Sequence, residues 1–177
     1  MVVLDADRLD IMKDQILEIL KSLDEWIQEE KNGPESFRIK PINEIVLLGQ
    51  VALLIDDQVR SSLNPVATID VDAWLEMDFA VEIEFKKRLV EKGLELDLLS
   101  KEIWLRNNYE KELFYEGEYL TCYKVAPLDL LLSKAIKAPK KNKKLIQSAL
   151  VDDEIGEELI RLIESEGGDL GYFLNES

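Results

Sequence analysis

The segment 44–74 constrains the fold more than any other part of this 177-residue chain. Its first residues, 44–49, form an apolar run that ends in a glycine, which predicts a short buried strand. The chain then turns into an apolar helix over 51–55, and 56–65 is predicted to be a loop. The β-branched residues of 66–73 predict a second strand. The segment therefore predicts a strand, a glycine turn, a helix, a loop and a strand, in that order.

The rest of the chain predicts helices around this segment and a later hairpin. An apolar stripe at spacings of three and four predicts an amphipathic first helix, which Asn32-Gly33-Pro34 would end. Further helices are predicted over 77–92, from Pro127, over 142–151 and over 153–166, a short helix or irregular segment over 98–107, and hairpin strands over 111–115 and 118–125. We expect an α+β fold, a mixed sheet flanked by helices, in three parts: an N-terminal helix in 1–35, a core in 36–126 and a helical part in 127–177.

Asp70 and Asp72 stand out on the second predicted strand. Residues two apart on a strand point to the same face, so the two carboxylates should lie side by side. Their repulsion is relieved by a cation, and oxygen ligands suit Mg²⁺, which takes one or two carboxylates together with substrate phosphates. The plainer alternative is that both are strand-end residues that cap a turn or face water.

Composition narrows the chemistry. The chain has no histidine, so the usual general base and the commonest zinc ligand are missing. Its one cysteine, Cys122, permits no internal disulfide. No stretch is apolar and long enough to span a membrane, and no secretory signal opens the sequence. We therefore expect a cytoplasmic protein with no membrane partner, whose chemistry depends on carboxylates, lysines and a hard metal ion.

The charge of the chain is unevenly spread. With 37 acidic and 22 basic residues the net charge is −15, which disfavours binding to duplex nucleic acid. Six lysines nevertheless fall within 134–144, and such a local cationic patch can attract a small polyanion such as a nucleotide. The alternative for most of these lysines is a solvated helix end.

Four features have the residue types of a phosphate and metal site. Gly49 permits close approach of backbone and phosphate, and Gln50 follows it at a helix N-terminus, which favours anions. Asp70 and Asp72 could hold a metal ion that bridges the same phosphates. Lys134 could neutralise the phosphate tail.

In this order, these residues resemble the nucleotidyltransferase superfamily, of polymerase-β-like fold, and most of all its small prokaryotic members related to AbiEii-type toxins. The likeness runs over roughly 40–150 and lies in Ile45-Val-Leu-Leu-Gly-Gln-Val-Ala-Leu-Leu54, Thr68-Ile-Asp-Val-Asp72 and Asp129-Leu-Leu-Leu-Ser-Lys-Ala-Ile-Lys-Ala138. It implies Mg²⁺-dependent transfer of a nucleotidyl group from a nucleoside triphosphate (NTP) to an acceptor. In this scheme Asp70 and Asp72 bind metal, Gly49 and Gln50 bind nucleotide, and Lys134 assists as pyrophosphate leaves.

The chain also departs from the pattern of this superfamily. Gln50 replaces the usual glycine or serine, and the strand 119–125 lacks the third carboxylate that the superfamily generally uses there. Glu112 and Glu118 are the candidate substitutes. The lysine segment keeps Lys141 but lacks the acids that often follow in relatives.

These departures leave two alternatives to an active transferase open. One is a catalytically degenerate member of the fold that acts in a toxin–antitoxin-like pair, with its acidic surface binding a basic protein partner. The other sets the resemblance aside and takes the chain as an α+β domain in which Asp70 and Asp72 are ordinary surface acids.

Overall fold

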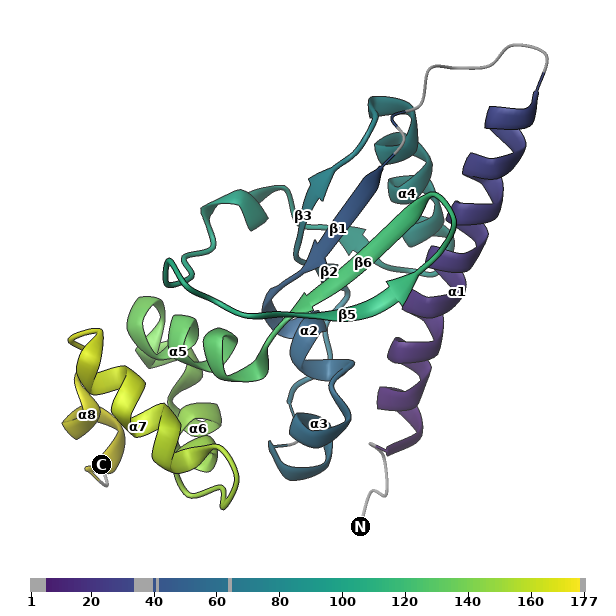
Figure 1. Cartoon of the computed structure of the whole chain (residues 1–177). Coiled ribbons are helices and arrows are strands. Elements are labelled where there is room, and N and C mark those ends of the chain that lie inside the picture. The colour runs from purple at the N-terminus through teal and green to yellow at the C-terminus, as the bar shows by residue number, and fades with distance from the viewer. Residues whose placement is uncertain (1–5, 34–39, 41, 64, 176–177) are drawn as a thin grey trace.

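The computed structural model describes residues 6–33, 40, 42–63 and 65–175. It shows an α+β fold with a mixed sheet flanked by helices, as the sequence predicts (Figure 1). Pro34, expected to end the first helix, and Asn64 of the predicted loop lie outside the described residues. The elements are α1 (Ala6–Asn32), β1 (Asn43–Leu47), α2 (Gly49–Leu54), α3 (Asp57–Leu63), β2 (Asp70–Val71), β3 (Ala73–Glu76), α4 (Phe79–Glu91), β4 (Glu95–Leu96), the 3₁₀ helix η1 (Leu98–Glu102), β5 (Lys111–Glu116), β6 (Leu120–Val125), α5 (Pro127–Lys137), α6 (Pro139–Leu150), α7 (Gly156–Ser165) and α8 (Leu170–Leu174).

The main sheet has the strand order β3-β1-β6-β5. Strand β1 is antiparallel to β3 and parallel to β6, and β5 and β6 form an antiparallel hairpin. The hairpin turn is the predicted one, because Gly117 N–H donates to the Leu120 carbonyl at 2.9 Å. A separate pair of short parallel strands, β2 and β4, lies beside the sheet.

Helix α1 packs by a single apolar stripe, as predicted. The stripe is buried, and α1 packs against α4, whose own buried face is Val81, Phe85 and Leu89. The two helices lie along one side of the sheet (Figure 1). The buried residues of the α1 stripe are Met12, Ile16, Ile19, Leu20, Leu23 and Ile27. Among the described residues, no helix is apolar over enough turns to cross a membrane.

The predicted loop 56–65 is wrong over most of its length, because α3 forms there. The Asp56 carboxylate accepts the N–H groups of Gln58 at 3.1 Å and Val59 at 3.0 Å, which caps the start of the helix. Val59 and Leu63, four residues apart, are buried. An aspartate followed by this spacing is a helix signal that the serines in the segment concealed.

The predicted strand 66–73 is only partly correct. The chain is regular strand at β2 and β3, and the break falls at Asp72. The break arises because the two halves have different partners: β2 pairs with β4, and β3 pairs with β1. The Asp72 carbonyl accepts the Leu48 N–H at 2.9 Å, so this residue joins the two sheets.

The four helices after the sheet form a helical group, in which α5 packs on α2 and α6 packs on α3. Pro127 opens α5 as predicted, because a proline in the first turn removes no helical hydrogen bond. Helix α6 begins at Pro139, earlier than expected, and α8 was not predicted. This packing brings the lysine-rich end of α6 toward the turn between β1 and α2.

Candidate functional site

The turn between β1 and α2 is built around Gly49. Its φ is +57°, a backbone conformation that other residues rarely adopt. A Cβ at this position would overlap the carboxylate of Asp72. Gly49 is therefore required both for the turn and for the approach of Asp72 to the backbone.

Gln50 holds two neighbouring segments in place. Its backbone N–H donates to the Asp72 carboxylate, and its side-chain Nε2 donates to the Val66 carbonyl at 2.9 Å. The first turn of α2 therefore binds a carboxylate of the protein itself. The long side chain that replaces the expected glycine or serine ties α2 to the segment before β2 and lines the adjacent cavity.

Asp70 and Asp72 line one cavity, of about 810 Å³, which we call the Asp70 cavity. The strand on which the sequence prediction placed both residues is broken at Asp72. Asp70 is exposed and Asp72 is half-buried. Burial raises the pKa of Asp72, and the negative charges of Asp97 and Asp70 raise it further. The hydrogen bond from the Gln50 N–H and the positive charge of Lys134 lower it, but by less. The ionised form of Asp72 is thus destabilised, a state that a bound cation would relieve.

Asp97 is the acidic residue of this site that sequence reasoning missed. Its N–H donates to the Val71 carbonyl at 3.0 Å at the end of the β2–β4 pair, so it lies beside Asp72 and lines the same cavity. Its carboxylate also caps η1 by accepting the Leu99 N–H at 2.8 Å. The only sequence signal is an aspartate after the short run Leu94-Glu-Leu96, which is too brief to predict a strand.

The two acids expected as substitutes for a third carboxylate lie elsewhere. Glu112 pairs with the buried Lys124, which also binds Asp56 at 2.6 Å, and these residues line a separate cavity. Glu118 lies at the β5–β6 turn and accepts a hydrogen bond from Gln28 at 2.9 Å. Neither residue lines the Asp70 cavity.

Lys134 projects from α5 into the same region as Asp72. Burial lowers the pKa of Lys134, and the positive charge of Lys141 lowers it further. The negative charge of Asp72 raises this pKa, but the net shift is downward. Four lysines at the start of α6 also line the Asp70 cavity: Lys140, Lys141, Lys143 and Lys144. The cavity therefore combines acids from the β2–β4 region with lysines from α5 and α6, which suits a metal ion bound together with a polyanion.

A second cavity, of about 570 Å³, adjoins the first, and we call it the Trp104 cavity. The two cavities share Asp72, Lys134 and Lys141, while Gly49 and Trp104 line only the second. All five residues predicted from the sequence, Gly49, Gln50, Asp70, Asp72 and Lys134, therefore line one or both of two connected cavities.

The residues present fit a Mg²⁺ ion only if a ligand completes its coordination. Asp70 and Asp72 offer hard oxygen donors in one cavity. Across the described part of the chain, however, no three His, Cys, Asp or Glu side chains gather closely enough to hold a metal ion by themselves. Two carboxylates plus phosphate oxygens is a usual set for Mg²⁺, so metal and phosphate would bind together.

Comparisons of the chain with known protein families, with curated proteins and with solved structures find no match. The function is therefore inferred from the geometry of the two cavities.

Proposed function

We propose that the chain binds an NTP with Mg²⁺ at Asp70 and Asp72 and transfers its nucleotidyl group to an acceptor hydroxyl. The observation that supports this proposal is that the five residues chosen from the sequence converge on two connected cavities. A half-buried aspartate with a raised pKa, placed in a cavity beside a lysine with a lowered pKa, is also characteristic of functional sites.

The reaction assigns a role to each group. The acceptor oxygen attacks the α-phosphorus, the bond from that phosphorus to the oxygen bridging to the β-phosphate breaks, and pyrophosphate leaves. The acceptor's proton passes to a carboxylate of the cavity. Mg²⁺ held by Asp70 and Asp72 would neutralise charge on the phosphate oxygens. Lys134 donates to the departing pyrophosphate, and Gly49 and Gln50 hold Asp72 in position.

Isothermal titration tests this proposal. Each of the four NTPs is titrated into the wild type and into Asp70→Asn/Asp72→Asn, with Mg²⁺ and with EDTA. We expect binding of at least one NTP that requires Mg²⁺ and is lost in the double variant, because asparagine keeps the size but loses the charge. No binding of any NTP at millimolar concentration would contradict the proposal.

A second candidate function is nucleotide binding without transfer. It is favoured by the small number of closely placed acids in the described residues. In that case the chain, with nucleotide bound, would act on a partner protein. Its net charge of −15 favours a basic partner. Pyrophosphate release, measured with the bound NTP and candidate hydroxyl acceptors, separates the two functions, because only the transferase produces it.

A further inference from the structure

The Trp104 cavity has an apolar and aromatic wall that the phosphate chemistry does not use. The wall is formed by Ile103, Trp104 and Leu130, and the charged side chains of Glu102 and Lys137 lie at the same cavity. Its volume of about 570 Å³ is within the usual range for small-ligand sites. A ligand with its phosphates at Lys134 would therefore have room for an uncharged ring system on this side.

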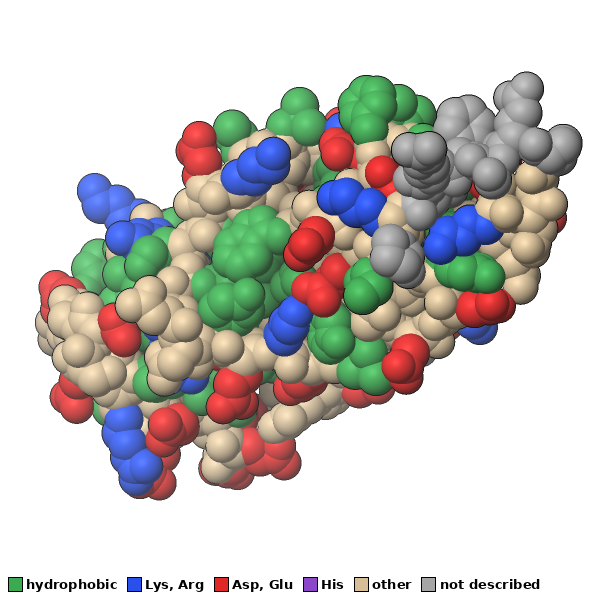
Figure 2. All heavy atoms as spheres, turned by 45° about the horizontal axis from the view of Figure 1, so that its top comes forward, with side chains coloured by type: hydrophobic (Ala, Val, Ile, Leu, Met, Phe, Trp, Pro, Cys, Tyr) green, Lys and Arg blue, Asp and Glu red, His purple; other side chains and the backbone are tan. Residues whose placement is uncertain are grey.

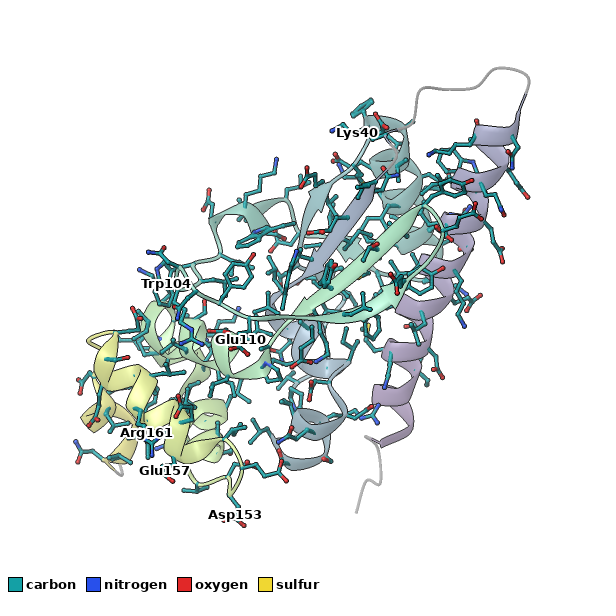
Figure 3. The ribbon with its side chains drawn as sticks, viewed as in Figure 1. Lys40, Trp104, Glu110, Asp153, Glu157 and Arg161 are labelled. Atoms are coloured by element: carbon teal, nitrogen blue, oxygen red, sulfur yellow. The ribbon has the colours of Figure 1, made fainter. Side chains whose placement is uncertain are left out.

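Hydrogen bonds between its segment of the chain and α5 hold Trp104 in this cavity. It lies in the connection between η1 and β5, which passes beside α5 (Figure 3). The Ser133 hydroxyl, one residue before Lys134, donates to the Trp104 carbonyl. The buried Asp129 accepts from Arg106 Nε and, at 2.8 Å, from the Glu110 N–H. Three hydrogen bonds thus tie the connection 103–110 to α5, the helix that carries Lys134. One of the three is made by the backbone of Trp104 itself.

The Trp104 ring is partly exposed, and it faces the cavity region that Lys137 also lines. The residue is only half-buried, and the Lys137 ammonium lies 5.2 Å from the ring centroid. Lys137 is exposed and its side chain is flexible, so it can move aside and leave the ring to a planar base, which stacks on aromatic side chains. Trp26 and Trp74, by contrast, line neither of the two cavities.

We propose that the nucleobase of the bound nucleotide stacks on Trp104, with its phosphates directed toward Lys134 and Asp72. This inference rests on the proposed function and adds the position of the base to it. Stacking on an aromatic ring is tolerant of base identity, so all four bases should gain from Trp104. The connection 103–110 then serves as the base-binding segment of the protein.

The test compares a ligand that has a base with one that lacks it. ATP and inorganic tripolyphosphate, each with Mg²⁺, are titrated into the wild type, Trp104→Leu, Trp104→Phe and the control Trp26→Phe. We expect Trp104→Leu to weaken ATP binding roughly tenfold and to leave tripolyphosphate binding unchanged, because leucine fills space without a π face. Trp104→Phe should keep most of the ATP affinity.

Tryptophan fluorescence gives an independent readout if the leucine variant does not fold. ATP should quench fluorescence in the wild type and in Trp26→Phe, and the quenching should disappear in Trp104→Phe. Unchanged ATP affinity in Trp104→Leu, or quenching that persists in Trp104→Phe, would overturn the base site and leave the phosphate site standing. If the wild type binds neither ATP nor tripolyphosphate, the proposed function itself fails.

Discussion

At the scale of single residues, the site depends on the contact between Gly49 and Asp72. The positive φ of Gly49 lets α2 begin where the carboxylate of Asp72 lies, and the Gln50 N–H then binds that carboxylate. Gly93 and Gly167 also have positive φ, of 73° and 72°, but a Cβ on either would meet nothing within 4 Å. The three glycines therefore share a backbone requirement, and only Gly49 also has a steric one.

This difference predicts the effects of two matched substitutions. Gly93→Ala should cost about 1–2 kcal/mol of unfolding free energy, because alanine is strained in the left-handed region. Gly49→Ala should cost more, and it should also weaken Mg²⁺–NTP binding by displacing Asp72. Urea unfolding and calorimetry measure the two effects. This account would be contradicted if Gly49→Ala and Gly93→Ala lost the same stability and Gly49→Ala kept its nucleotide affinity.

Residue by residue, sequence reasoning found the parts of the site that carry a local pattern. Gly49, Asp70 and Asp72 could be found because an apolar run, a glycine and paired acids are visible within a few positions. Asp97 could not be found, because a two-residue strand, β4, places it beside Asp72. Glu112 was a reasonable substitute on charge, but the buried Lys124 binds it on another part of the sheet.

At the scale of elements, segments with a clear local pattern were predictable, and the short strands that depend on a distant partner were not. The stripe of α1 repeats over many turns, so its burial followed from spacing alone. Helix α3 has a local signal, the Asp56 cap, which the serines of the segment concealed. The break at Asp72, in contrast, depends on the partner strands β1 and β4. Tertiary pairing of this kind leaves little trace in a single sequence.

The connection 103–110 provides a prediction at this scale. Asp129→Ala should destabilise the protein by about 3–5 kcal/mol, because it leaves Arg106 half-buried without its carboxylate. Glu157→Ala is the matched control: it removes an exposed ion pair with Arg161 on α7 (Figure 3) and should cost about 0.5 kcal/mol or less. Denaturant unfolding of both variants measures the difference. Similar small costs would show that Asp129 does not anchor the connection.

At the scale of the whole molecule, charge is arranged in two ways. The face in Figure 2 has acidic side chains spread over it, with lysine and arginine between them, in keeping with a net charge of −15. The lysines of α6 instead gather on one wall of the Asp70 cavity. An acidic protein with a basic cavity wall repels extended polyanions over most of its surface and attracts a small one at the cavity.

In the proposed function, Asp72 serves ligand binding at the expense of stability. Its pKa is raised above the ordinary value of 3.8, so the native state holds this proton more tightly than the unfolded state does. Stability from this residue is therefore present at acid pH and is lost as the pH rises through the raised pKa. At neutral pH the ionised carboxylate destabilises the ligand-free fold, and its removal should stabilise that fold.

Thermal unfolding of Asp72→Asn, with and without Mg²⁺–NTP, tests this claim most directly. The control is Asp153→Asn, which removes the same charge from an exposed site before α7 (Figure 3). We predict that Asp72→Asn raises the ligand-free Tm above that of the control, and that Mg²⁺–NTP raises the Tm of the wild type and the control but not of Asp72→Asn. A lower ligand-free Tm in Asp72→Asn, together with a full ligand-induced rise, would contradict the account.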